Sequence, residues 1–177
     1  TEDYVIQPAD FVSPPKWHLG HVTWFFETLV LKKYLKGYKE FHPQYGFIFN
    51  SYYETVGKRV VRANRGDLSR PSVKEIYAYR RYVDEAMEKL LDEDIADEAE
   101  SVIEIGLNHE QQHQELLITD IKYILGNNPL FPAYGKLFDD MVTVDNKYHY
   151  TEMLRGLYEI GYKGNGFCYD NELQPHP

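Results

Sequence analysis

The sequence predicts a mainly α-helical protein: a four-helix bundle, followed by an irregular, partly β start of a second domain. Three observations carry this prediction. Long segments repeat apolar residues at the three- and four-residue spacing of a helix face. Short links join these segments, as in an antiparallel bundle. After Pro129 the helical period ends, and glycines, tyrosines and short alternating runs such as GLYEIGY predict strands and turns.

The same change of pattern sets the expected domain boundaries. We assign residues 1–128 to the helical bundle, residues 129–155 to a linker, and residues 156–177 to the N-terminal fragment of a second domain. That fragment holds too little apolar material to close a core by itself. We therefore expect the missing C-terminal part of this domain to belong to the same chain.

The first helix is predicted from about Pro14 to Leu35. Ser13 is expected to cap it, and Pro14 and Pro15 occupy the first turn, where a missing N–H costs nothing. Its side chains at helical spacing form one stripe, which contains Trp17, His21, Trp24, Phe25, Thr28 and Leu29.

Three further segments complete the bundle. The segment FIFNSYYETVG is predicted to be a short helix, and the basic loop KRVVRANRGDLSRP follows it. Ser72 is expected to cap the next helix, SVKEIYAYRRYVDEAMEKLL, with a capping box completed by Glu75. The last helix is predicted to begin near Ile95 and to end at Gly126.

Composition argues against several classes of partner. The formal net charge of −9 disfavours nucleic acid, because binding to phosphates requires clustered Lys and Arg. No apolar run approaches the roughly 20 residues of a membrane span, so we expect no membrane partner. One cysteine, Cys168, and a polar, acidic N-terminal segment are typical of a cytoplasmic protein.

The segment HEQQH, residues 109–113, contains the metal motif H-E-x-x-H. Two imidazoles four residues apart share one helix face and can bind one metal ion. They continue a stripe expected to face the core, which contains Val102, Ile105, His109, Gln112, His113 and Leu116. A zinc protease would also need a third ligand, usually downstream, and would use Glu110 as its base. No downstream ligand motif is evident, which disfavours a protease.

The segment WHLGH in the first helix can supply the third ligand. His21 shares the inward stripe, whereas His18 lies about 60° round the helix and is expected at its edge. Three protein ligands leave positions open for substrates. Neutral nitrogen ligands suit Fe(II), Zn(II), Ni(II) or Cu(II), so spacing alone does not choose the metal.

Four blocks of the sequence carry a family resemblance. SPPKWHLGHVTWFFE, FIFNSYYETVG, GDLSRPS and NHEQQHQELL together resemble the N-terminal domain of the ergothioneine-biosynthesis sulfoxide synthases, the EgtB family. The resemblance implies a DinB-like four-helix bundle. The tail GLYEIGYKGNGFCYDNELQPHP resembles the start of the family's second domain, which has the formylglycine-generating-enzyme, C-type lectin-like fold.

The resemblance also implies a function and a metal site. The family uses one non-haem Fe(II) and O2 to join a thiol, cysteine or γ-glutamylcysteine, to hercynine as a sulfoxide. The chain would then belong to an iron-dependent oxidoreductase. The implied metal ligands are His21, His109 and His113, and Gln112 is implied to contact hercynine. His18 is then not needed as a ligand.

Two further sets of residues follow from the same resemblance. Arginines of the basic loop hold the thiol substrate's carboxylate in this family, which here indicates Arg59 and Arg62, with Arg65 at the same interval. A solvated loop with surface ion pairs would explain these arginines equally well. Tyr52 and Tyr53 match a tyrosine pair that donates a proton in part of the family. In the rest of the family, the donor lies in the second domain.

Two other functions stay open. A DinB-like metal-dependent thiol transferase uses a similar three-histidine metal, often zinc or nickel, and no O2. A non-catalytic metal-binding helical bundle would bind neither a thiol nor a betaine. The second-domain tail favours the sulfoxide synthase. Because its substrate cleft should lie between two domains, the fragment alone can bind metal and still lack activity.

Overall fold

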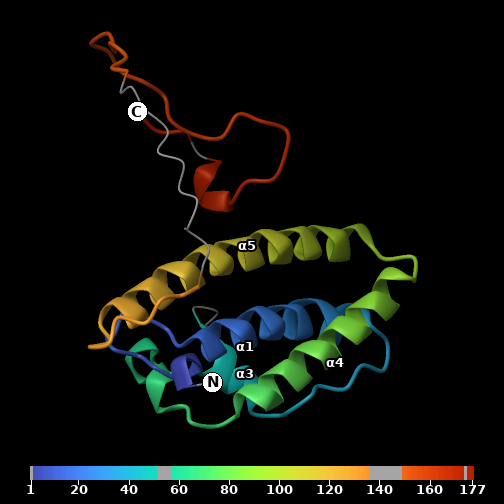
Figure 1. Cartoon of the computed structure of the whole chain (residues 1–177). Coiled ribbons are helices and arrows are strands. Elements are labelled where there is room, and N and C mark those ends of the chain that lie inside the picture. The colour runs from blue at the N-terminus through green and yellow to red at the C-terminus, as the bar shows by residue number, and fades with distance from the viewer. Residues whose placement is uncertain (1, 52–56, 136–148, 174) are drawn as a thin grey trace. The chain divides into compact units, whose positions relative to one another are not determined.

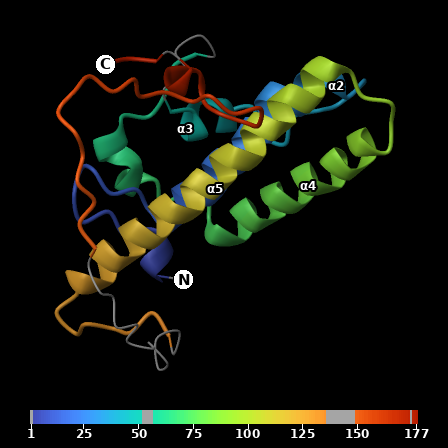
Figure 2. The ribbon, with the colours of Figure 1, turned by 90° about the horizontal axis from the view of Figure 1, so that it is seen from above.

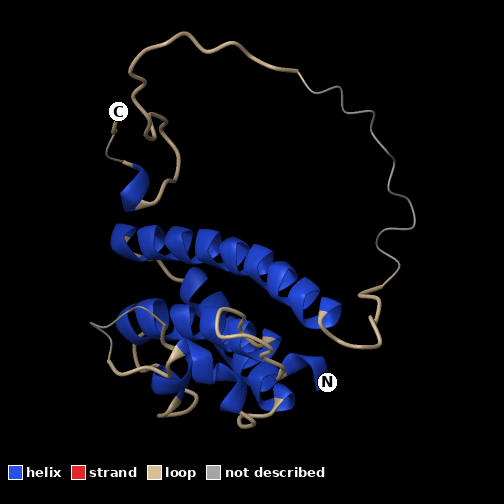
Figure 3. Ribbon diagram, turned by 90° about the vertical axis from the view of Figure 1, so that its left-hand side faces the viewer, coloured by secondary structure: helices blue, strands red, loops and turns tan. Residues whose placement is uncertain are grey.

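The computed structural model describes residues 2–51, 57–135, 149–173 and 175–177. Two compact units divide the chain, Thr1–Lys136 and Leu137–Pro177, and each is described by itself. Helices dominate the described secondary structure (Figure 3). None of the described helices has both the length and the apolar character that a bilayer span requires.

One long helix runs through the centre of the first unit. It consists of α1 (Pro15–Phe25), a π-helical stretch (Phe26–Leu31) and α2 (Lys32–Tyr34). The prediction of a helix from Pro14 to Leu35 is therefore confirmed to within one residue at each end. Almost every side chain of α1 is buried, because α3, α4 and α5 all contact this helix.

The other two long helices pack against the central helix. They are α4 (Val73–Leu91) and α5 (Asp97–Gly126), and the chain reverses direction between them (Figure 1). Seen from above, α5 lies over the central helix and α4 lies alongside (Figure 2). The predicted capping box is confirmed: the Ser72 hydroxyl accepts from the N–H of Glu75, and the Glu75 carboxylate accepts from the N–H of Ser72.

Aromatic and aliphatic side chains of these helices form the hydrophobic core. Its buried members are Trp17, Trp24, Phe25, Phe26, Val30, Leu31, Tyr45, Phe49, Ile76, Tyr79, Val83, Ala86 and Leu90. Each fully buried large side chain contributes about 1.5–3 kcal/mol by leaving water. Gly106 lets α5 approach closely, since a Cβ there would lie 2.7 Å from the Phe26 ring. This close approach sets α5 beside the central helix one turn before His109.

The short helix predicted over residues 47–57 can be compared only over its described residues. There α3 spans Tyr45–Phe49, and Asn50 and Ser51 after it are not helical; residues 52–56 of the predicted segment lie outside the described residues. The basic loop predicted to follow contains a 3-10 helix, Arg62–Asp67. Both segments pack near the start of the central helix, where they contribute to the site described below.

The predicted N-cap of the first helix is wrong. Pro14 occupies the cap position, and no side chain caps the helix there. Ser13 is buried, its backbone N–H donates to Asp120 over 2.9 Å, and its hydroxyl accepts from Arg65 over 2.8 Å. These partners draw Ser13 away from the cap and tie the start of the central helix to α5 and to the basic loop.

The second unit contains no strand among its described residues. It has a 3-10 helix, Asp170–Glu172, and an isolated antiparallel bridge between Ile160 and His176. The strands expected after Pro129 therefore do not form in residues 149–173 and 175–177. A pair of extended segments is marginal without a packed face, and most of the large apolar side chains described here are exposed, with Leu157 at 92%. The lectin-like fold stays a prediction.

Candidate metal centre

Three histidines converge between α1 and α5. His21 on α1 and His109 and His113 on α5 each offer one ring nitrogen, and these nitrogens lie within 4.8 Å of one another. The pair on α5 is one helical turn apart, so both rings point to the same side. These are the three residues predicted from the sequence as ligands. The structure brings them together at one point.

Burial keeps all three imidazoles uncharged. It lowers the pKa of His21 to about 3, with smaller contributions from His109, Arg65 and His18, against the opposing effect of the hydrogen bond that His21 donates to the Phe49 carbonyl. Burial lowers the pKa of His109 to about 4. Burial, helped by the adjacent histidines and Arg65, lowers the pKa of His113 to about 2. Neutral imidazole is the form that binds a metal ion.

The proton of His21 has a defined position. Its Nδ1–H donates to the backbone carbonyl of Phe49 over 2.6 Å, which leaves a lone pair on Nε2. The Phe49 ring packs on Gly20, where a Cβ would lie 2.2 Å from the ring. Glycine at this position therefore lets α3 carry its terminal carbonyl close enough to orient His21.

The contact between His21 and His109 fits a bound cation. Their Nε2 atoms face each other over 3.2 Å, so one proton at most can lie between them. The buried Nδ1 of His109 has no hydrogen-bond partner within the described parts of the chain. A metal ion would satisfy both facing nitrogens, and the proton displaced from Nε2 could move to Nδ1. The residues present therefore fit a metal held by three neutral nitrogen ligands.

Two tryptophans and an arginine surround His21. Trp17 stacks on the His21 ring with centroids 4.6 Å apart and planes at 12°, and Trp24 stacks at 5.5 Å and 17°. The guanidinium carbon of Arg65 lies 3.3 Å from the centroid of the Trp17 ring. This stack fixes His21 from the side and places a permanent positive charge near the histidines.

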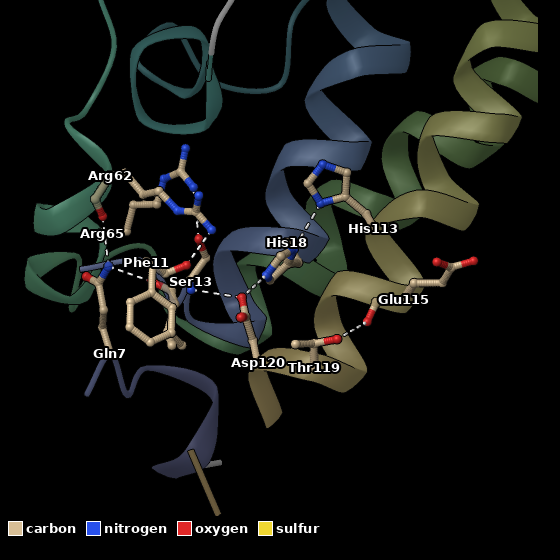
Figure 4. Close-up of polar contacts among 11 residues, drawn as sticks. Gln7, Phe11, Ser13, His18, Arg62, Arg65, His113, Glu115, Thr119 and Asp120 are labelled. Carbon is tan, nitrogen blue, oxygen red and sulfur yellow. Dashed lines mark hydrogen bonds and ion pairs between the residues drawn. The ribbon is translucent and has the colours of Figure 1, made fainter. Parts of the chain in front are cut away.

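The histidines open onto a cavity of about 310 Å³. Its lining consists of Ser13, Trp17, His18, His21, Ser51, Arg62, Arg65, His109, Gln112, His113 and Leu116. Gln112, predicted to contact hercynine, is an exposed residue at this wall. Arg62 also lines the cavity and donates to the Phe11 carbonyl (Figure 4). Arg59 is half-buried and is not among the lining residues.

Arg65 is the arginine that the structure places deepest in this wall. It is buried, and its guanidinium donates to the hydroxyls of Ser13 over 2.8 Å and Ser51 over 3.1 Å. The sequence shows it at the same three-residue interval as Arg59 and Arg62, but periodicity alone does not favour it. Its burial depends on the 3-10 helix Arg62–Asp67, whereas the sequence predicted a loop at these residues.

Two predictions about helix faces need correction. His18, expected at the edge of the first helix, is only 4% exposed, because α1 is surrounded by other elements. In the stripe on α5, Ile105 and Leu116 are about 40% exposed rather than facing the core. Gln112 in the same stripe is exposed as well. The α5 stripe therefore faces the core at His109 and opens toward solvent around it.

Glu110 points away from the histidine cavity. Both of its carboxylate oxygens accept from the guanidinium of Arg80 on α4 over 3.2 Å. It is not among the cavity-lining residues. In this arrangement Glu110 is not placed to act as the base of a zinc protease, which agrees with the sequence argument that disfavours that class.

Tyr52 and Tyr53, predicted as proton donors, lie outside the described residues. Ser51, directly before them, lines the cavity. The catalytic role of the tyrosine pair stays a prediction.

Comparison with known proteins adds one finding. The family model described as the DinB superfamily matches residues 1–117. A search of curated proteins finds no significant match. The matched range contains α1, α4 and α5 as far as Leu117, and so contains all three converging histidines.

Proposed function

This chain belongs to the DinB superfamily, and from that premise we propose that it forms the metal-binding domain of an Fe(II)- and O2-dependent sulfoxide synthase. The enzyme would join a thiol, cysteine or γ-glutamylcysteine, to hercynine. One observation carries the proposal: three neutral imidazoles and a buried arginine line the same cavity. The four sequence blocks that resemble the sulfoxide synthases support the choice of reaction.

In this proposal His21, His109 and His113 hold the iron. When bound, Fe(II) would supply a Lewis acid that lowers the pKa of a thiol and would relay the electrons of the two substrates to O2. The protein keeps its ligands ready by burying them as neutral rings. The Phe49 carbonyl and the two stacked tryptophans hold His21 in a single orientation.

Arg65 and Arg62 are proposed to hold the carboxylate of the thiol substrate. A guanidinium can donate two parallel hydrogen bonds to a carboxylate. Arg65 is already held by Trp17 and two serine hydroxyls, so little side-chain freedom is lost when substrate binds. We prefer Arg65 to Arg59 because Arg65 lines the cavity.

Gln112 is proposed to contact the imidazole of hercynine. Its amide offers both a donor and an acceptor, which match the two nitrogens of a neutral imidazole. Tyr52 or Tyr53 is proposed to donate the proton that the reaction requires. The rest of the second domain, implied by the resemblance, would complete the cleft.

The proposed reaction balances with O2 as the only oxidant. The thiol S–H and the hercynine ring C–H bonds break, and a C–S bond and an S=O bond form. These two oxidations release four electrons, which O2 accepts. One oxygen atom ends on sulfur, and the other leaves as water with the two hydrogens.

A metal-dependent thiol transferase is the second candidate. The family match covers residues 1–117, which is the helical part that such an enzyme requires. It would use the same three histidines and the same cavity without consuming O2.

The deciding experiment uses the full-length natural protein, loaded anaerobically with Fe(II). Hercynine and either thiol are then added with O2, and the products are measured by mass spectrometry. We expect a hercynyl sulfoxide and consumption of one O2 per product. No sulfoxide with either thiol would overturn the proposed reaction, and transfer of the thiol to an added electrophilic acceptor in a parallel anaerobic assay would establish the second candidate. An Arg65→Gln variant should raise the KM for the thiol, whereas an Arg59→Gln control should change it less.

A further inference from the structure

We propose that Asp120 and His18 form a hydrogen-bonded relay that fixes the proton of His113 on Nδ1, and so keeps its Nε2 available to a metal ion. Both are positioning residues, because they act through His113. The inference rests on the metal centre of the proposed function but not on its reaction.

The relay is a chain of three contacts, two of them buried and the one between His18 and His113 part-buried. One carboxylate oxygen of Asp120, Oδ2, lies 2.9 Å from the backbone nitrogen of Ser13 and 2.9 Å from Nε2 of His18. The other ring nitrogen of His18, Nδ1, lies 2.9 Å from Nδ1 of His113 (Figure 4). His18 and Asp120 are 4% and 6% exposed, so water has little access to these contacts.

The donors along this chain can be assigned step by step. The Ser13 amide is always a donor, so Asp120 Oδ2 is an acceptor. His18 then donates from Nε2, which in the neutral ring leaves a lone pair on Nδ1. Two Nδ1 atoms 2.9 Å apart need one proton between them, and that proton belongs to His113. The lone pair of His113 is therefore on Nε2.

The three proposed ligands differ in how their second nitrogen is held. Nδ1 of His21 donates to the backbone carbonyl of Phe49, which no substitution of a side chain can delete. Nδ1 of His113 depends on the side chain of His18 instead. A carboxylate that orients a metal-binding imidazole is a recurring arrangement, and here a second imidazole extends it by one link.

The spacing on α5 matches this role. Asp120 follows His113 by seven residues, which is close to two helical turns, so both side chains point to the same side of α5. A purely structural ion pair between His18 and Asp120 would satisfy the same two residues. In such an ion pair a cationic His18 would donate from Nδ1 to Nδ1 of His113 and so place the proton of His113 on Nε2, and that difference can be measured.

The first test is nuclear magnetic resonance of the imidazole nitrogens in the metal-free 177-residue chain. We expect His113 to carry its proton on Nδ1 and His18 on Nε2. A proton on Nε2 of His113 would overturn the proposal. In a His18→Leu variant, which removes the acceptor, we expect His113 to populate both tautomers.

The second test is metal affinity, measured by competition titration with Zn(II) and with Co(II). His18→Leu should weaken binding by about 10–100-fold, the usual effect of losing such a partner. His18→Asn, whose side-chain oxygen can replace the Nδ1 acceptor, should recover part of the loss. Adding Asp120→Asn to His18→Leu should cause little further loss, because the two residues act in series.

A matched control separates positioning from stability. Val83→Ala removes buried volume on α4 at a residue that does not line the histidine cavity, and should lower thermal stability while leaving metal affinity unchanged. Equal metal affinity in wild type and folded His18→Leu would overturn the relay. If the wild-type chain binds metal but the full-length enzyme forms no sulfoxide, the proposed reaction is overturned and the relay still holds.

Discussion

Two buried polar clusters lie six residues apart on the central helix and differ in how completely they are satisfied. Around Glu27, the carboxylate accepts from the Tyr38 hydroxyl over 2.7 Å, the Phe41 N–H over 2.8 Å and the Tyr79 hydroxyl over 2.6 Å. Around His21, two imidazole nitrogens face each other over 3.2 Å beside a cavity. Both central residues are 2% exposed.

The difference separates a structural cluster from a functional one. The donors to Glu27 stay protonated, because burial and the carboxylate both raise the pKa of Tyr38 and of Tyr79. Its oxygens are therefore satisfied by the fold itself. In the histidine cluster, by contrast, the buried Nδ1 of His109 has no hydrogen-bond partner among the described residues. Substitution of Glu27 should consequently lower the free energy of unfolding, whereas substitution of a histidine should lower the affinity for a metal ion.

The largest expected effect is the loss of metal affinity in His109→Ala. We expect binding to weaken by more than about 100-fold, since a direct ligand matters more than the outer partners worth 10–100-fold. Isothermal titration with Zn(II) would measure this effect. Affinity unchanged from wild type would show that the converging histidines are a structural cluster like the one at Glu27.

Glu27→Gln should cost about 2 kcal/mol of unfolding free energy. Glutamine keeps one acceptor oxygen but turns an amide N–H group toward one of the donors, and hydrogen bonds to a charged acceptor are worth roughly 1.5–3 kcal/mol each. Denaturant unfolding would measure the cost. Metal affinity should stay at the wild-type value, and a parallel fall in affinity would refute the separation of the two clusters.

The stability of the metal-free chain should fall as the pH is lowered below about 6.5. The pKa values of His21, His109 and His113 are lowered in the folded state, to about 3, 4 and 2, so the unfolded state binds protons first. Each histidine can contribute up to about 1.4 kcal/mol per pH unit in this window. The free energy of unfolding, measured with urea at pH 7, 6 and 5, should fall less steeply with decreasing pH in His113→Leu than in wild type. An identical pH dependence would contradict the lowered pKa of His113.

Glu110→Gln should have the smallest effect. Its pair with Arg80 is 25–30% exposed, and such pairs contribute about 0–1 kcal/mol. Metal affinity and turnover of the full-length enzyme should therefore match wild type. A loss of activity of 100-fold or more would indicate that Glu110 is a catalytic base, contrary to its position beside Arg80.

Local signals predicted much of the fold and the proposed ligands. The limits of the long helices follow from Pro15, from the Ser72 capping box and from Gly126, which are short-range features. The four-residue spacing of His109 and His113 places both rings on one side of α5 without any tertiary information.

The remaining features depend on packing between elements. Nearly every side chain of α1 is buried, so an amphipathic stripe could not distinguish the burial of His18 from that of His21. Asp120 and Arg65 are charged residues that become buried only when α5 and the basic loop meet Ser13. The periodicity of a single segment does not predict these tertiary contacts between segments.

The stack around His21 has a spectroscopic consequence. The chain contains two tryptophans, and both indole rings stack on this one imidazole. Nearly all fluorescence excited at the red edge of protein absorption must therefore originate beside the proposed ion. An open-shell ion such as Co(II) or Cu(II) would quench this emission by electron or energy transfer, whereas d10 Zn(II) would leave it bright. The protein thus carries its own optical reporter of which ion occupies the centre, with no label attached.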